Sequence, residues 1–265
     1  MDKVTVPLLK QMKRQGQKIV ALTSYDYSTT RLLNESGVDV ILVGDSLGMV
    51  KLGYSSTLPV TVEDMVYHTR IVARGNSRAL LVTDMPYMSY QASLEDAVRS
   101  GGKMIKAGAE AVKIEGGTEM SRIIRALMVA KIPVMGHLGM TPQSVHMFGG
   151  YRVQGRERAA RKNLLSDAKA LERLGVFALV LECVPMDLAR KITRAISIPT
   201  IGIGAGPHCD GQVLVIDDMI GITAPPLPRF VKSYARVRET IRSAVRAYGR
   251  DVRRGTFPDD AHSYR

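Results

Sequence analysis

Residues 40–48 read VILVGDSLG, and this short stretch contains a pattern that recurs along the whole chain. Its first part, Val40–Val43, is an apolar run with the length and composition of a buried parallel strand. Gly44 ends the run, and Asp45 and Ser46 come directly after it. The stretch therefore predicts a buried strand whose carboxyl end carries polar side chains that can do chemistry.

Short runs of the same kind occur eight times, and helical patterns lie between most of them. The predicted strands are Ile19–Leu22, Val40–Val43, Ala79–Thr83, Ala111–Ile114, Ile132–Met135, Phe177–Leu181, Pro199–Ile203 and Val213–Ile216. The predicted helices include Leu94–Ala107 with Ser93 as its N-cap, Glu119–Ala130, Leu164–Leu174 and Asp187–Ile196. One strand in about every 33 residues is typical of a (β/α)8 barrel. Because the strands are spread evenly, we expect an α/β fold with a single TIM-barrel domain over residues 1–265 rather than a doubly wound sheet.

The composition is that of an ordinary globular protein, with 45% hydrophobic and 23% charged residues. It excludes a disordered chain, a collagen and a coiled coil. The longest apolar run, residues 176–181, is far shorter than the roughly 20 residues of a membrane-spanning helix. The N-terminal segment is charged throughout, unlike a signal peptide, and the two cysteines form no CxxC pair. We therefore expect a cytoplasmic protein with free thiols and no membrane association.

Polar side chains follow five of the predicted strands at the point where each strand ends. They are Asp45 and Ser46 after the second strand, Asp84 after the third, Lys113 and Glu115 at the fourth, His137 after the fifth and Glu182 after the sixth. Any one of them could be a helix cap or a core residue. The carboxyl ends of barrel strands meet at one face, where active sites are built, so the sequence predicts that all of them line one pocket.

The residue types at this face favour a hard cation over zinc, because two aspartates and a glutamate occur there without cysteine. A 2-oxo acid offers two oxygens to such an ion, and the metal can stabilise an enolate as a Lewis acid. Lys113 can neutralise a substrate carboxylate, and Glu182, on a separate strand, can act as the general base. These residues predict a metal-dependent barrel with enolate chemistry, but they do not identify a substrate.

Long and unusual motifs carry a resemblance to a known family. They are LVGDSLGM (Leu42–Met49), STLPVT (Ser56–Thr61), YHT (Tyr67–Thr69), VKIEGG (Val112–Gly117), GHLGMTPQS (Gly136–Ser144), FGGYRVQGR (Phe148–Arg156), LECVP (Leu181–Pro185), IGIGAG (Ile201–Gly206) and DGQ (Asp210–Gln212). In order and spacing the chain resembles the ketopantoate hydroxymethyltransferase family from about Val4 to about His262. The number and length of the matching motifs make a chance resemblance implausible.

This resemblance implies a (β/α)8 barrel of the phosphoenolpyruvate/pyruvate type, a homo-oligomer such as a decamer, and a place in pantothenate and coenzyme A synthesis. The implied reaction moves a one-carbon unit from 5,10-methylenetetrahydrofolate to 3-methyl-2-oxobutanoate and gives 2-dehydropantoate through a Mg²⁺-stabilised enolate. For Mg²⁺, the resemblance implies Asp45, Asp84 and Glu115, the last of them through water. For the 2-oxo acid, it implies Asp45, Ser46, Asp84, Lys113 and His137. Glu182 is the implied proton acceptor.

The formal net charge of +12 is unevenly distributed. A basic segment at about residues 229–254 has Arg238, Arg242 and Arg246 at helical spacing beside an apolar stripe, which predicts an amphipathic helix with a solvated basic face. A second basic group follows the FGGYRVQGR motif and comprises Arg152, Arg156, Arg158, Arg161 and Lys162. One hypothesis is that this second group attracts the glutamate tail of folate.

Two other interpretations stay open at this point. The first is a Mg²⁺-dependent lyase or mutase of the same barrel superfamily that acts on a 2-oxo acid without folate. The second, remote alternative is a basic nucleic-acid-binding barrel in which the acidic residues are structural, although no nucleic-acid motif accompanies the charge and aromatic residues are only 5% of the chain.

Overall fold

The computed structural model describes residues 2–265 and divides the chain into two compact units. The first unit extends to Val215, and the second is Ile216–Arg265. The predicted polar face and all strands belong to the first unit. No helix within residues 2–265 combines the length and the apolar composition needed to cross a membrane.

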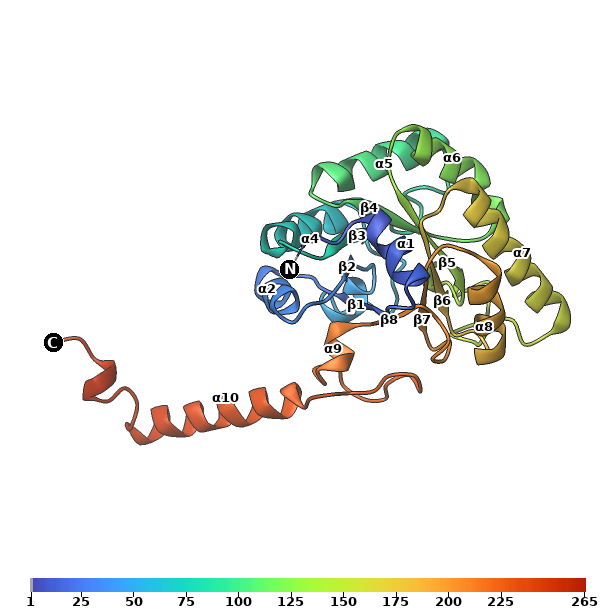
Figure 1. Cartoon of the computed structure of the whole chain (residues 1–265). Coiled ribbons are helices and arrows are strands. Elements are labelled where there is room, and N and C mark those ends of the chain that lie inside the picture. The colour runs from blue at the N-terminus through green and yellow to red at the C-terminus, as the bar shows by residue number, and fades with distance from the viewer. Residues whose placement is uncertain (1) are drawn as a thin grey trace. The chain divides into compact units, whose positions relative to one another are not determined.

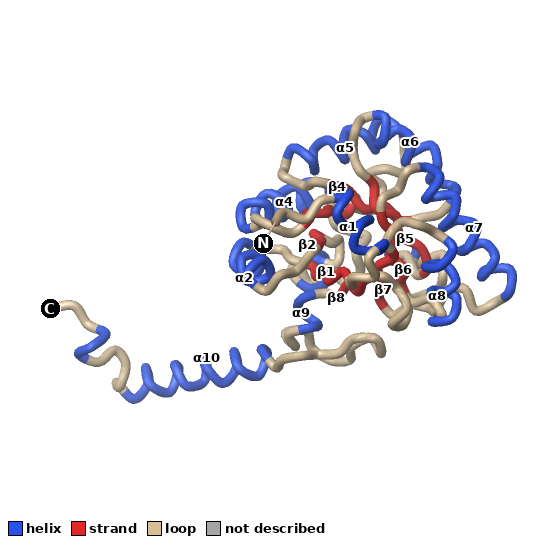
Figure 2. Tube along the Cα trace, viewed as in Figure 1, coloured by secondary structure: helices blue, strands red, loops and turns tan. Residues whose placement is uncertain are grey.

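The first unit is a closed barrel in which each strand pairs in parallel with the next and β8 pairs with β1 (Figures 1 and 2). Its strands are β1 (Ile19–Thr23), β2 (Val40–Val43), β3 (Leu80–Asp84), β4 (Ala111–Glu115), β5 (Val134–Gly139), β6 (Ala178–Glu182), β7 (Thr200–Ile203) and β8 (Gly211–Leu214). Every residue of β2 to β5 is buried, as near-continuous apolar strands covered on both faces must be. The predicted (β/α)8 barrel is confirmed.

The helices of the first unit are α1 (Val6–Arg14), α2 (Tyr27–Glu35), α3 (Leu47–Val50), α4 (Val62–Gly75), α5 (Leu94–Lys106), α6 (Ser121–Val129), α7 (Arg158–Leu174) and α8 (Met186–Ala195), with the 3-10 turns η1 (Thr118–Met120) and η2 (Pro142–Ser144). Most of them surround the barrel on its outer side, whereas α1 lies across one end (Figure 2). Ser93 caps α5 as predicted, because its hydroxyl accepts from the backbone N–H of Asp96. Thr61 and Asp64 form a capping box that begins α4 in the same way.

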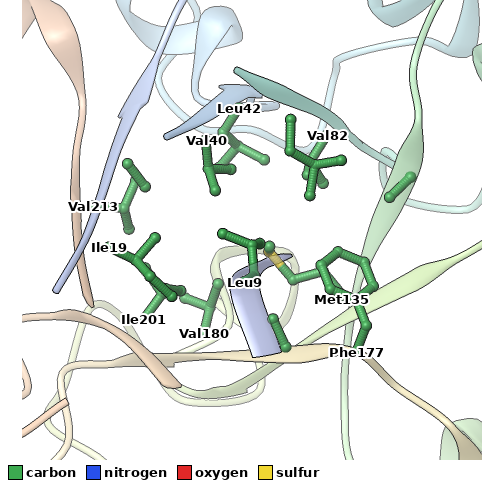
Figure 3. Close-up of a cluster of buried hydrophobic side chains, with 14 of the residues drawn as sticks. Leu9, Ile19, Val40, Leu42, Val82, Met135, Phe177, Val180, Ile201 and Val213 are labelled. Carbon is green, nitrogen blue, oxygen red and sulfur yellow. The ribbon is translucent and has the colours of Figure 1, made fainter. Parts of the chain in front are cut away.

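Helix α1 closes the amino-terminal end of the barrel. Leu9, which is fully buried, packs among side chains from the beginnings of the strands, including Ile19, Val40 and Phe177 (Figure 3). Val4 and Met12 belong to the same cluster. The barrel interior is therefore filled with apolar side chains at this end, which leaves the carboxyl end for polar residues.

Most element boundaries differ from the predictions by one or two residues, and three of the differences are informative. The eighth strand begins at Gly211, two residues earlier than predicted, and Ile216 belongs to the next helix. Strand β5 continues to Gly139, so His137 lies inside the strand and not at its end. Helix α7 begins at Arg158 instead of Leu164, because its basic first turns have no apolar periodicity that a sequence pattern could register.

The second unit contains α9 (Ile216–Met219), α10 (Val237–Arg254) and the 3-10 turn η3 (Asp260–His262). Helix α10 covers most of the basic segment at residues 229–254, as its amphipathic pattern predicts. None of its described residues is buried, and its apolar residues Ile241, Val245 and Tyr248 are exposed.

Candidate active site

The structure brings the predicted polar residues together at the carboxyl ends of β2 to β6. Six of them form one connected set of contacts. Asp45 contacts Asp84, which pairs with Lys113, and Lys113 contacts His137. His137 in turn lies next to both Glu115 and Glu182. Ser46 follows Asp45 in the chain, and its hydroxyl lies 2.8 Å from that of Tyr25 in a hydrogen bond outside this set. Except for Ser46 and Glu182, all of these predicted residues are buried.

The two aspartates are in direct contact. The backbone N–H of Asp45 donates to Asp84 Oδ2 at 3.1 Å, so the end of β3 fixes the turn after β2. Burial raises the pKa of Asp45 well above its usual value, and the negative charges of Asp84 and Glu115 raise it further. Burial also raises the pKa of Asp84, although Lys113 acts against this effect. Asp45 and Asp84 thus share a site that disfavours their ionised forms.

Lys113 is the cation of the cluster. Its ammonium lies 3.2 Å from Asp84 Oδ1 and 3.2 Å from His137 Nδ1. Burial alone lowers the pKa of this lysine, but Asp84, Glu115 and Asp45 together raise it above its usual value. Lys113 therefore stays charged and provides a fixed positive point inside the barrel.

His137 connects this cation to Glu182. Its Nδ1 lies 3.5 Å from Glu115 Oε1 and its Nε2 lies 3.4 Å from Glu182 Oε2. Burial and Lys113 lower the pKa of His137, whereas the two glutamates raise it, and the net shift is upward. Lys113 and Glu115 both face Nδ1, and Glu182 faces Nε2, so the ring bridges the cation and the two glutamates.

Glu182 is the most accessible carboxylate of the cluster, with 16% of its side chain exposed. Its backbone carbonyl accepts a hydrogen bond from the N–H of Met140 at 2.8 Å, which joins β6 to the end of β5. Gly139 permits this approach, since its φ is +100° and a Cβ there would lie 2.2 Å from the Glu182 carbonyl oxygen. A conformation open only to glycine thus fixes the backbone of the predicted base.

Gln143 is a residue of this site that the sequence did not assign. Its Nε2 donates to Asp45 Oδ2 and to the Met85 carbonyl, both at 2.9 Å. Its backbone N–H donates to Glu115 Oε2 at 2.9 Å, and its Oε1 accepts from Tyr90. The only sequence signal was its place in the GHLGMTPQS motif, which says nothing about these partners.

The donor set fits a hard cation. Within residues 2–265, Asp84 Oδ1 and Glu115 Oε1 are buried oxygens without a hydrogen bond, and their neighbours are Lys113 at 3.2 Å and His137 at 3.5 Å. The same residues contain no cluster of three or more His, Cys, Asp or Glu side chains at the spacing of a metal site. Mg²⁺ usually needs only one or two carboxylates and takes its other ligands from water and substrate. Asp45 and Asp84 meet that requirement, and Glu115 lies beyond them.

Solved structures with a similar fold include several enzymes. A phosphonopyruvate hydrolase, solved in complex with oxalate and Mg²⁺, superposes with a TM-score of 0.64 over 99% of this chain and 92% of its own, at 13% identity. A 2,3-dimethylmalate lyase, described as a PEP mutase/isocitrate lyase superfamily member, gives 0.60 over 97% and 91%, at 13% identity. At such low identity these neighbours show the fold alone, and it is the TIM barrel that the sequence predicts.

Sequence comparisons show the family. Residues 3–260 match the family described as ketopantoate hydroxymethyltransferase. The 3-methyl-2-oxobutanoate hydroxymethyltransferase of Syntrophus aciditrophicus (strain SB) is 54% identical over 263 residues, which cover 99% of this chain and 97% of that protein. The corresponding protein of Moorella thermoacetica is 54% identical over 265 residues, covering 100% and 98%. The chain therefore belongs to the ketopantoate hydroxymethyltransferase family, a family of enzymes, as its motifs predict.

Proposed function

We propose that this enzyme transfers a hydroxymethyl unit from 5,10-methylenetetrahydrofolate to 3-methyl-2-oxobutanoate and produces 2-dehydropantoate for pantothenate and coenzyme A synthesis. The observation that carries the proposal is the contact chain from the paired Asp45 and Asp84, through Lys113 and His137, to Glu182. It combines a cation-binding end, a fixed positive charge and an accessible base within one buried site.

A magnesium ion would be held by Asp45 and Asp84, with Glu115 as an outer partner. When bound, it would act as a Lewis acid on the 2-oxo group and stabilise the negative charge of the enolate. The pKa shifts support this assignment, because the buried Asp45 and Asp84 carboxyl groups disfavour ionisation unless a positive charge is near.

The chain's own residues account for the proton transfer. Lys113 neutralises the substrate carboxylate, and Glu182 takes the proton from C3 of the substrate. His137 Nε2 lies 3.4 Å from Glu182 Oε2, and in this proposal the ring holds the carboxylate in position for the substrate. The C3 carbon then bonds to the methylene carbon of the donor, and one water molecule supplies the hydroxyl group as tetrahydrofolate leaves. The transfer needs no oxidant or reductant.

Proton exchange in deuterated buffer tests this mechanism. The enzyme is incubated with 3-methyl-2-oxobutanoate and Mg²⁺ without folate, and the C3 proton signal is followed by NMR for the unmodified enzyme and for Glu182→Gln. We expect loss of the signal only when both the metal and Glu182 are present. Glu95→Gln is the matched control, because Glu95 lies on α5 with 78% of its side chain exposed.

Addition of 5,10-methylenetetrahydrofolate to the same samples completes the test. Formation of 2-dehydropantoate supports the proposed reaction, and formation only after folate addition means that the donor must bind before the proton is removed. Exchange without any folate-dependent product favours a lyase or mutase, and neither exchange nor product would refute the proposed substrate.

A further inference from the structure

Helices α7 and α8 are neighbours in the fold (Figure 1), and their residues line a basic groove. It consists of two hollows that share Arg161 and Lys191. The first, of about 600 Å³, is lined by Arg158, Ala159, Arg161, Lys162, Leu165, Leu188 and Lys191. The second, of about 410 Å³, is lined by Arg161, Asp187, Arg190, Lys191 and Arg194. Cations from two helices thus face one continuous depression.

The charge of the groove is largely uncompensated. Six of its lining residues are basic and one, Asp187, is acidic. Asp187 pairs with Arg161, and this contact holds the pKa of the Asp187 carboxyl below its usual value. In the described part of the chain, Arg161 is the only one of the six basic residues that forms an ion pair. The remaining five cations are available to a ligand with several negative charges.

The groove begins close to the predicted base. Glu182 ends β6 and α8 starts at Met186, so only a short turn separates them. The loop before α7 lies against that turn, because the N–H of Gln154 donates to the Cys183 carbonyl at 2.9 Å. The same loop reaches the groove at Gly155, whose carbonyl accepts from Arg161 at 3.4 Å.

Both helices present their amino-terminal ends at this place. Residues 158–162 form the start of α7, and Asp187 lies in the first turn of α8. Neither helix has a side-chain N-cap hydrogen bond. The positive ends of the two helix dipoles therefore add to the charge of the basic side chains where the groove meets the turn after Glu182.

We propose that the basic groove binds the γ-linked glutamate chain of the folate donor, an inference that rests on the proposed function. Each further glutamate adds one free carboxylate, and a row of arginines and lysines suits such a repeated anion. The structure also revises the hypothesis drawn from the sequence. Arg152 and Arg156 do not line the groove, whereas Arg190, Lys191 and Arg194 from α8 do.

Direct binding of a fluorescein-labelled penta-γ-glutamate peptide to the full-length enzyme tests the groove without catalysis. The variant Lys162→Gln/Lys191→Gln removes two groove charges. Arg122→Gln/Arg125→Gln removes two exposed charges from α6 and serves as the matched control. We expect the dissociation constant to rise roughly threefold to tenfold in the groove variant and by less than about twofold in the control.

A kinetic comparison links the groove to the substrate. In the unmodified enzyme and in the control we expect a lower KM for the pentaglutamate form of the donor than for the monoglutamate form. This ratio should fall toward one in the groove variant. Equal peptide affinity in the groove variant and the unmodified enzyme would overturn the proposal, as would equally tight binding of an oligothymidylate of the same charge.

The two proposals can fail separately. Turnover of both donor forms with equal KM in the unmodified enzyme refutes the tail site and leaves the proposed reaction intact. Groove-dependent binding of the peptide without turnover of either donor refutes the proposed reaction and leaves a site for oligocarboxylates.

Discussion

Gln143 and Asp45 are held together by a 2.9 Å hydrogen bond inside the barrel, although 98 residues separate them in the sequence. The backbone of Gln143 meanwhile donates to Glu115. One residue thus sets the positions of two of the three carboxylates that we assign to the cation site. It does so from a 3-10 turn, η2, that follows β5.

Replacement of Gln143 by alanine should weaken both the fold and the metal site. The change removes the donor to Asp45 Oδ2 and to the Met85 carbonyl, whereas Tyr90 keeps its contacts with the Glu115 backbone. Loss of such buried partners costs about 1–3 kcal/mol of unfolding free energy. We also expect weaker Mg²⁺ binding, measured by titration calorimetry. Gln91→Ala is the control, since Gln91 contacts Gln143 Oε1 at 3.0 Å. Equal loss of Mg²⁺ affinity in both variants would contradict a specific role for Gln143.

Gly139→Ala should disturb the position of Glu182. The added Cβ would meet the Glu182 carbonyl oxygen at 2.2 Å and would occupy a φ of +100° that alanine disfavours. We expect a loss of about 2 kcal/mol or more in unfolding free energy, measured by urea denaturation, together with loss of C3 proton exchange. Gly102→Ala in α5 is the control, because no atom lies within 4 Å of the position of its added methyl group. Since alanine favours the helix over glycine, this change should raise the free energy of unfolding by about 0.5–1 kcal/mol. Similar destabilisation by both changes would count against the argument.

Magnesium should raise the melting temperature, and it should do so more at neutral pH than at pH 5. The pKa values of Asp45 and Asp84 are raised in the folded state, so the unfolded chain loses these protons first as the pH rises above about 3.8. Without a cation, the free energy of unfolding therefore falls as the pH rises through this range. A bound cation reverses that loss, and at low pH protons compete with it. At a hundred times its dissociation constant the ion adds about 2.7 kcal/mol.

The double variant Asp45→Asn/Asp84→Asn should lose the melting response to Mg²⁺. Glu63→Gln/Glu95→Gln changes two exposed acids and should keep it. If the response survived in the first variant, the cation would bind elsewhere.

Cys183 should react slowly with iodoacetamide at neutral pH. Burial, and to a lesser extent the charge of Glu182, raise the pKa of its thiol to about 11. The alkylation rate should therefore increase about tenfold per pH unit between pH 7 and pH 10. In a Cys209→Ala background, mass spectrometry should find faster alkylation after Glu182→Gln than after Glu95→Gln. The same rate in both would mean that Glu182 does not act on the thiol.

Local sequence patterns predicted most of the barrel, because a short buried strand or a capped helix such as α5 is determined by residues that follow one another in the chain. The start of β8 was not predictable in this way. Gly211 reads as a loop residue, yet it pairs with Ile19 of β1, where a Cβ would lie 2.5 Å from the Ile19 carbonyl oxygen. Only the closure of the barrel turns that glycine into a strand residue.

The site shows the same division. Barrel topology predicts that Asp45, Asp84 and Glu182 meet, because they end parallel strands. Gln143 escaped prediction because its partners come from distant segments, and no spacing in the sequence indicates them. For the basic groove, the sequence indicated the cations of α7, which follow one another in the chain. It did not indicate those of α8, because they lie on a different helix and only the fold brings them next to α7.

The closure of the barrel by Leu9 has a consequence for the order of events in turnover. Because apolar side chains fill its amino-terminal end, the barrel leaves the carboxyl ends of the strands as the way to the polar site. In the proposed reaction, two reactants would share that way. A small acid seated against Lys113 would then enter before the bulkier donor, and the spent donor would leave before the product.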